Sequence, residues 1–483
     1  MVRCDYMEGM GSDTESQHSP EQATLALTPE TESRIHLWQE TGIYPHPELQ
    51  VFPQPRTHEY SRTELMLIHH LSTISNDLHL KATSHLTIWT QKLPKFLSIA
   101  ALHPYVMSSL LSFSASHLAW VHNSSGARQL HLHYGSIALQ GLHEAIGNFS
   151  PANADAILAA SLLLLWQATD WRSWSSLRGG VQSILSTMHS MQHESLFTEY
   201  VASEDALAIA FRVPQRRPSI NPNDRVGILQ NAAYALQRLQ NTLVGNEVEL
   251  HYSSLLLAYI QQLQNAQPAQ NPEDQFAYLY QLRKWLFWIP VALLQRDGGQ
   301  GPALLTLAHF YASALALEPL FPDLGSSFCA ATALTPLEAI LAVTEAMQSQ
   351  HGTSPAAMEI AASMQYPRQM AMEYKTRTMH LQSLPVHSPL PTQRPEQAMG
   401  RYVKMESQSP ANIPYLPSQP QEAAATTSYL TPPNQSWEMS PQSWNPVPSP
   451  QFPPPSLQGY DDHMSNYGYT GFVQPSRSNA LWT

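Results

Sequence analysis

Histidine has the greatest capacity for chemistry among the residue types of this chain, which contains 22 histidines. Two pairs have the spacing of metal ligands: His131 with His133, and His189 with His193. The second pair is four residues apart, which predicts that both imidazoles share one helix face. The residues between them read Ser-Met-Gln and lack the glutamate of a zinc-protease helix, and no nearby carboxylate or cysteine completes a ligand set. We therefore expect surface or lightly buried histidines, and no cofactor held by this chain.

Motifs of the common catalytic sites are missing from the sequence. It contains no Gly-x-Ser-x-Gly nucleophile elbow, no phosphate-binding loop and no dinucleotide fingerprint. The glycine pairs Gly179-Gly180 and Gly298-Gly299 fall in expected turns, and neither follows a strand. Because only 13 % of the residues are charged, few acid–base pairs are available. The sequence predicts a protein that is not an enzyme; an enzyme acting on a hydrophobic substrate is kept as an alternative.

Large apolar and aromatic residues gather in two places, one around Trp166 to Trp174 and one around Trp285 to Ile289. In a helical domain such clusters are usually ordinary packing. Their second interpretation is an apolar cavity between helices that admits a hydrophobic small molecule, because ligand pockets are mostly apolar with a few polar anchors. The residues we expect to line such an effector pocket are Leu110, Leu111, Trp166, Trp171, Trp285 and Trp288.

Helix signals recur from about residue 59 to residue 380. Ser61 to Glu64 form a capping box, and the residues behind it repeat at helical spacing. Proline or a capping residue predicts further helix starts at His103-Pro104, Ser150-Pro151, Asn271-Pro272 and Thr335-Pro336. The alternating β-branched runs of strands are missing. The fold class is therefore predicted as all-α, with one large helical domain over 59–380.

Both ends of the chain differ from this domain in composition. Residues 1–58 are polar, with one apolar cluster at Ile35, Leu37 and Trp38, and are expected to form a mostly disordered leader. Residues 381–483 hold 18 of the 39 prolines, with Ser, Gln and scattered aromatic residues between them. Such a segment buries too little apolar area to fold, so we expect a disordered tail with a possible activation function. Its Lys404 lies in a Val-Lys-Met-Glu tetrad that resembles the acceptor of ubiquitin-like modifiers.

Charge, cysteine content and apolar run length restrict the protein's environment. The 25 basic and 37 acidic residues give a net charge of −12, so the chain as written has no general attraction for nucleic-acid phosphates. Two cysteines, Cys4 and Cys329, support neither a disulfide scaffold nor a thiolate zinc site. The longest apolar run, 156–166, is too short for a membrane helix, and no secretory signal opens the chain. We expect a soluble intracellular protein without membrane contact.

Three segments of the helical zone resemble one family. Residues 64–71 read Glu-Leu-Met-Leu-Ile-His-His-Leu, residues 103–107 read His-Pro-Tyr-Val-Met, and 111–119 continue as Leu-Ser-Phe-Ser-Ala-Ser-His-Leu-Ala. Residues 304–312 read Leu-Leu-Thr-Leu-Ala-His-Phe-Tyr-Ala. In this order they resemble the regulatory domain of fungal zinc binuclear cluster transcription factors similar to the sterol uptake control protein. The resemblance covers about 60 to 350.

The resemblance implies an all-α domain with an apolar effector pocket in a nuclear regulator. Shuttling with the cytoplasm and formation of a homodimer are further expectations. Members of the family carry an N-terminal six-cysteine zinc cluster that contacts DNA, whereas only Cys4 precedes the helical zone here. Arg3-Cys4-Asp5-Tyr6 resembles the end of such a cluster, so Cys4 is a zinc ligand only if the cluster extends upstream of Met1. Otherwise the chain acts on metabolic or secondary-metabolite genes through a DNA-binding partner or the transcription machinery. A scaffold protein without transcriptional work is the other alternative.

Overall fold

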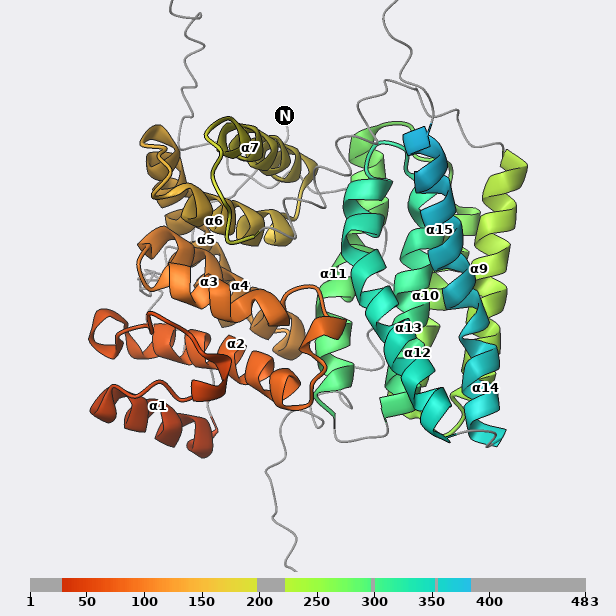
Figure 1. The fold of residues 1–483 in the computed structure, drawn as a ribbon, viewed down its shortest axis with the longest axis horizontal. Helices are drawn as coiled ribbons and strands as arrows, with labels where there is room; N and C mark the ends of the chain where they lie inside the picture. Colours follow the sequence, from red (N-terminus) through yellow and green to blue (C-terminus); the bar gives the residue numbers. More distant parts are fainter. Residues whose placement is uncertain (1–27, 198–221, 297–299, 352–354, 384–483) are drawn as a thin grey trace, which may run out of the picture. The chain divides into compact units, whose positions relative to one another are not determined.

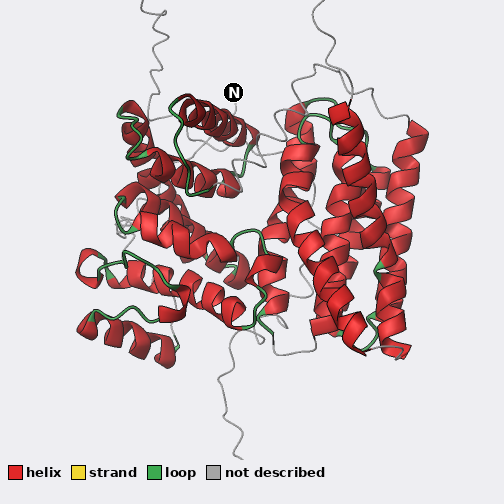
Figure 2. Cartoon of the chain, viewed as in Figure 1, coloured by secondary structure: helices red, strands yellow, loops and turns green. Residues whose placement is uncertain are grey.

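A computed structural model of the chain describes residues 28–197, 222–296, 300–351 and 355–383. Within these ranges the regular structure consists of helices alone, which confirms the all-α prediction (Figure 2). The first group of α-helices comprises α1 (Pro29–Thr41), α2 (Arg62–Leu80), α3 (Leu93–Ala100), α4 (Pro104–His122), α5 (Ser125–Gly147), α6 (Ala154–Gln167) and α7 (Trp171–Ser190). The second comprises α9 (Pro222–Thr242), α10 (Glu247–Asn265), α11 (Pro272–Leu294), α12 (Gln300–Leu317), α13 (Ala331–His351), α14 (Pro355–Ser363) and α15 (Gln365–Ser383).

Several helix starts lie where the local sequence predicted them. At the start of α2 the Ser61 hydroxyl accepts a hydrogen bond from the amide of Glu64, and the Glu64 carboxylate accepts one from the amide of Ser61. The first residue of α4 is Pro104. The Asn271 side chain caps α11, whose first residue is Pro272. These caps supply partners for amide groups that a helix start leaves unbonded.

Helical structure begins at Pro29 rather than near residue 59, so the boundary placed after residue 58 was too late. Thr28 caps α1 with its hydroxyl and Pro29 occupies the first position, which is a standard helix start. Ile35 and Trp38 are each only 1 % exposed and anchor α1 on the core. The apolar cluster that interrupted the polar leader was therefore the signal of a packed helix. Residues 1–27 lie outside the described part of the chain.

Two other predicted starts were wrong. Ser150 to Asn153 form a turn, with the Asn153 side chain accepting from the Ser150 amide, and α6 begins only at Ala154. Thr335-Pro336 lies inside α13, which begins at Ala331 directly after a π-helical turn over Ser326–Ala330. After this turn the chain is already helical when it reaches Pro336. Ala333 and Leu337, on either side of Pro336, are fully buried. Packing therefore overrides the local capping signal.

Buried apolar residues from both groups of helices form one core. α6, apolar nearly all round, has eleven buried residues and packs against α4 and α7. In the second group α12 is buried along most of its length and lies beside α13 and α15 (Figure 1). α4 and α5 approach closely at Gly141, where an added Cβ would lie 2.6 Å from the Cβ of Tyr105. Glycine is needed there for space.

By length and composition, two helical stretches of the described chain could cross a membrane, Gln300–Leu320 and Phe328–Ser349. Polar residues such as His309 and Ser313 interrupt the first stretch, so it is not one continuous apolar run. The first stretch is 89 % buried and the second 44 % buried within the protein. The apolar composition of α12 is accounted for by its place in the core.

Candidate functional site

The aromatic residues expected around an effector pocket fall into separate ring clusters. Trp288 of α11 contacts Phe113 of α4 with 4.9 Å between ring centroids, and Trp166 of α6 contacts Phe287 at 5.6 Å. Trp89 belongs to this first cluster, with its ring centroid 5.3 Å from that of Phe113. Leu110 and Leu111 lie buried on α4 in the same core. Ring contacts of this length leave no room for a ligand between the members.

Trp171 and Trp285 lie in two other clusters. Trp171 stacks on Trp174 at 5.7 Å and contacts Phe276 at 6.3 Å. Trp285 contacts Tyr259 at 5.7 Å and Phe310 at 6.2 Å. The structure therefore does not place the six predicted residues along one wall, and the pocket they were expected to line stays a prediction.

Two hollows of about 200 Å³ each are formed by other residues. One is bounded by α9, α12 and α15, and the second lies around Lys81, Thr83, Arg296 and Ala303. Neither is lined by any of the six predicted residues. Both are smaller than the roughly 300–1,000 Å³ typical of small-molecule sites. A large lipid therefore does not fit into either hollow as it stands.

Arg283 is a buried cation that sequence reasoning missed. Its guanidinium donates to the carbonyl of Ala168 at 3.0 Å and to that of Leu165, at the corner between α6 and α7. It also lies over the Phe328 ring, 5.1 Å from the centroid. Burial lowers the pKa of Arg283 to about 10, so the group stays charged at neutral pH. The signal available in the sequence was an arginine set among the apolar residues of α11.

A histidine pair, with His117 buried and His70 partly buried, joins two segments that carry the family resemblance. His70 Nε2 of α2 and His117 Nδ1 of α4 are 2.9 Å apart, and the His117 ring lies 4.8 Å from that of Trp288. One ring donates and the other accepts, so the pair is stable when both rings are neutral. Burial lowers the pKa of His117 to about 3 and that of His70 well below its usual range, with the charge of the neighbouring histidines adding to the effect.

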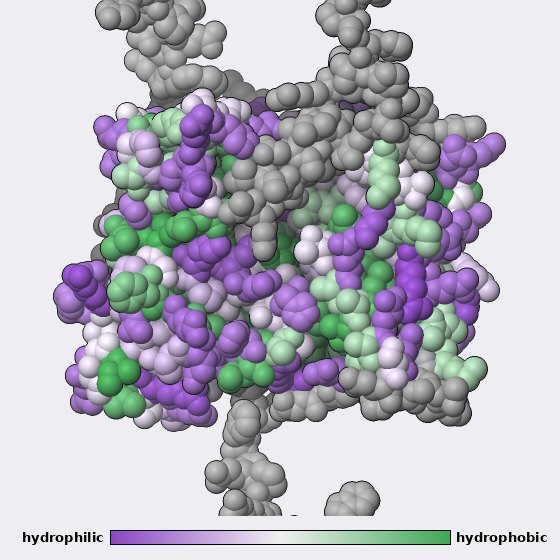
Figure 3. Space-filling model, viewed as in Figure 1, coloured by the Kyte–Doolittle hydropathy of each residue, from purple (hydrophilic) through white to green (hydrophobic). Residues whose placement is uncertain are grey.

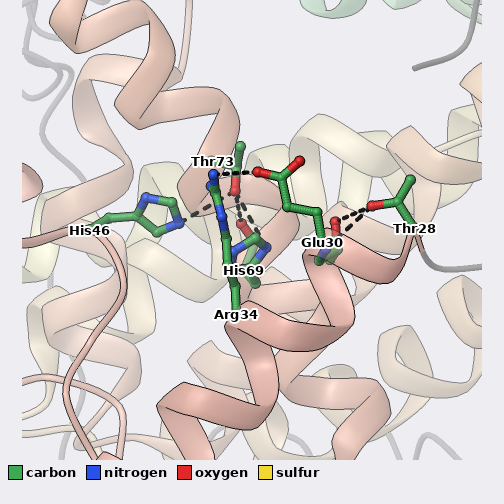
Figure 4. Close-up of polar contacts among 7 residues, drawn as sticks. Thr28, Glu30, Arg34, His46, His69 and Thr73 are labelled. Atoms are coloured by element: carbon green, nitrogen blue, oxygen red, sulfur yellow. Dashed lines mark hydrogen bonds and ion pairs between the residues drawn. The ribbon is translucent and has the colours of Figure 1, made fainter. Parts of the chain in front are cut away.

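A second histidine pair lies beside α1 (Figure 4). Thr73 of α2 donates to the carbonyl of His69 at 2.9 Å, and its hydroxyl oxygen lies 3.3 Å from ring nitrogens of both His46 and His69. Burial, followed by the charge of Arg34, lowers the pKa of His46 to about 4. Burial lowers the pKa of His69 to about 3. Arg34 itself is paired with Glu30 at 2.7 Å along α1.

The histidine pairs expected from spacing are held by other contacts. His131 bonds Ser112 of α4 through Nδ1 at 2.9 Å. α7 ends at Ser190, so His189 and His193 do not share a helix face as predicted; His193 instead bonds Asp155 at 3.1 Å. The Asp155 carboxylate also accepts from Ser195, which ties this segment to the start of α6. Within the described ranges no group of three or more His, Cys, Asp or Glu side chains is arranged to hold a metal ion.

The predicted zinc ligand Cys4 and the predicted modification site Lys404 lie outside the described residues. Cys329 is buried, and burial raises the pKa of its thiol. A buried thiol of raised pKa is a poor nucleophile.

Comparison with known proteins gives one similarity of limited extent. Over 100 residues the chain is 33 % identical to Sterol uptake control protein 2 of Candida albicans, a stretch that is 21 % of this chain and 13 % of that protein. The chain thus spans a small part of the length of this relative. No protein-family model matches the sequence, and no solved structure matches it.

Proposed function

We propose that this chain is a nuclear regulator of transcription, with a helical unit that senses an effector and residues 381–483 as an activation region. It reaches DNA through a DNA-binding partner, or through a zinc cluster to which Cys4 contributes. Sterol uptake or other metabolic and secondary-metabolite genes are the proposed targets.

The observation that carries the proposal is the 33 % identity to Sterol uptake control protein 2. The name of that relative describes control rather than transport or catalysis, and we extend the same kind of role to this chain. The net charge of −12 supports the need for a partner or an additional cationic module in DNA binding.

The structure is compatible with a sensing unit in one specific respect. Two of the segments that resemble the family, on α2 and α4, meet directly through His70 and His117. The third lies on α12, which is buried and contacts both α13 and α15. An effector shifts a conformational equilibrium only if it binds two states with different affinity. Contacts on these helices would provide that difference.

A tethered reporter assay tests the proposal. The full chain is fused to a heterologous DNA-binding domain, next to a matched fusion that ends at residue 380. We expect reporter output above that of the DNA-binding domain alone, with most of it lost on truncation. A third fusion keeps the full tail but has Trp437, Trp444 and Phe452 changed to serine. It separates the effect of the aromatic residues on reporter output from the effect of tail length. Reporter output no higher than that of the DNA-binding domain alone, with the fusion present in the nucleus, would contradict activation.

A further inference from the structure

A polar seam runs between α12 and α15 inside the second group of helices. We define the α12–α15 seam as His309, Ser313 and Glu318 on one side with Tyr366, Tyr374 and Arg377 on the other. His309 stacks on Tyr366, with 5.9 Å between ring centroids. Farther along, Arg377 pairs with the buried Glu318 at 2.7 Å and lies 5.5 Å from the centroid of the Tyr374 ring. The seam thus brings polar side chains from both sides together.

Two hydroxyl groups in this seam have unused hydrogen-bonding capacity. The hydroxyls of Ser313 and Tyr366 are buried, and neither has a hydrogen-bond partner among the described residues. Burial raises the pKa of Tyr366 and the neighbouring Ser313 hydroxyl lowers it, so the two hydroxyls lie close together with no further partner. A buried hydroxyl without a partner is costly and is uncommon in folded proteins. The pair therefore points to a polar group that joins them.

The hollow between α9, α12 and α15 adjoins the seam. Tyr366, Tyr374 and Arg377 belong both to its wall and to the seam. Its apolar wall includes Ile228, Leu315 and Met370, and its polar wall includes Asn231 and Gln369. An apolar wall with a few polar groups at one side is the usual composition of a small-molecule site.

We propose that this hollow and the α12–α15 seam bind a small neutral amphipathic molecule that bears a hydroxyl or carbonyl group. Its oxygen bonds the hydroxyls of Ser313 and Tyr366, and its apolar body lies on Ile228, Leu315 and Met370. The proposal rests on the proposed function, because it names the class of effector and the place where it binds.

Charge and size select this class of ligand. Arg377 already pairs with Glu318, and Glu373 at the wall of the hollow accepts a hydrogen bond from Gln369 at 2.7 Å. An anion would therefore face the carboxylate of Glu373 without a free cation to balance it. The volume of about 200 Å³ admits a short-chain or single-ring molecule and excludes a multi-ring lipid. The ligand is thus neutral and small.

Binding in this place would hold α15 against α12. α15 ends at Ser383 and leads directly into the residues proposed as the activation region. A ligand that contacts α9, α12 and α15 together stabilises the arrangement in which these helices are packed, which gives it the differential affinity that sensing requires.

Direct binding of 1-octanol to the full-length protein tests the site. Saturation-transfer NMR and thermal shift are measured for the wild type and for three variants. Ala316→Phe fills the hollow, Tyr366→Phe removes one hydroxyl, and Tyr234→Phe is a matched control because Tyr234 is 63 % exposed on α9. We expect saturable binding to the wild type and to Tyr234→Phe, about three- to tenfold weaker binding to Tyr366→Phe, and none to Ala316→Phe. Octanoate is expected to bind more weakly than 1-octanol.

Absence of saturable 1-octanol binding to the wild type would overturn the proposal, and so would binding that Ala316→Phe leaves unchanged. Circular dichroism checks the fold of each variant, and Ala316→Leu replaces the phenylalanine variant if that protein does not fold. The reporter assay is read separately. Binding without reporter output would contradict the proposed function alone, whereas reporter output without binding would contradict the site alone.

Discussion

Helices α1–α7 and helices α9–α15 are held together by different chemistry. In the first group, neutral polar side chains join separate segments of the chain: His70 with His117, Thr73 with His46, and Ser112 with His131. In the second group, buried polar side chains lie in the α12–α15 seam and also outside it, among them Glu249, Gln275 and Thr306, and charged pairs such as Arg377 with Glu318 join its elements. On the face shown in Figure 3, apolar and polar side chains are interspersed, so the difference lies in the interior. The first group holds His46, His69, His70 and His117, all with lowered pKa, whereas the second holds His309, so the first group should respond more strongly to pH. The second group should respond to an apolar ligand.

Acidification is expected to have the largest effect, and to act on α1–α5 first. An unfolded histidine takes up a proton below its ordinary pKa of about 6.5, whereas the folded values are about 4 for His46 and about 3 for His69 and His117. The free energy of unfolding therefore falls as the pH is lowered from 6.5 toward 4. At two pH units below 6.5 the loss reaches about 2.7 kcal/mol for each such histidine. His309 of α12 also has a pKa lowered by burial to about 4, but it is a single histidine. Hydrogen exchange at pH 7 and pH 5 should therefore show a larger loss of protection in α2 and α4, which carry His69, His70 and His117, than in α12. Equal loss in both groups would contradict the comparison.

Replacing Arg283 is expected to have the next largest effect, because this residue of α11 holds the corner between α6 and α7. Arg283→Met leaves the carbonyls of Leu165 and Ala168 without their donor and should lower the free energy of unfolding by about 3 kcal/mol. Arg283→Lys keeps the charge and should recover only part of the loss. Urea unfolding of both variants measures the difference. A loss below about 0.5 kcal/mol in Arg283→Met would show that the two groups are joined by apolar contact alone.

Gly141 tests the tight approach of α4 and α5 within the first group. Gly141→Val places a Cβ 2.6 Å from that of Tyr105 and should destabilise the protein by about 2–3 kcal/mol. Gly227→Ala on α9 is the control, because nothing lies within 4 Å of its added Cβ. That change should stabilise the protein by about 0.5–1 kcal/mol. Thermal unfolding of the two variants measures both the expected loss and the expected gain of stability.

The smallest effect is expected at the first turn of α2. Ser61→Ala removes the side chain that accepts from the Glu64 amide, so it should cost about 1 kcal/mol and leave α9–α15 unaffected. Ser349→Ala on α13, whose exposed hydroxyl bonds the carbonyl of Glu345, provides a matched control with an effect near zero. Chemical denaturation resolves this difference, and equal losses in the two variants would argue against a specific role for the cap.

The sequence predicted local structure better than it predicted contacts. The starts at Ser61, His103-Pro104 and Asn271 followed from residue types next to one another, since a cap depends only on its own turn. Thr335-Pro336 failed because the preceding turn and core packing decide that helix. The pairing of His70 with His117 joins residues 47 positions apart, so no local pattern contains it. The six expected pocket residues were chosen for size and apolarity, which ordinary core residues share.

Hydrogen exchange of the full-length protein at pH 7, with and without saturating 1-octanol, tests the division between the two groups most directly. We predict that protection rises in α12 and α15, around Ser313 and Tyr366, and stays unchanged around His70 and His117. Unchanged protection throughout the chain, or a rise centred on α2 and α4, would contradict the assignment of ligand sensing to the second group.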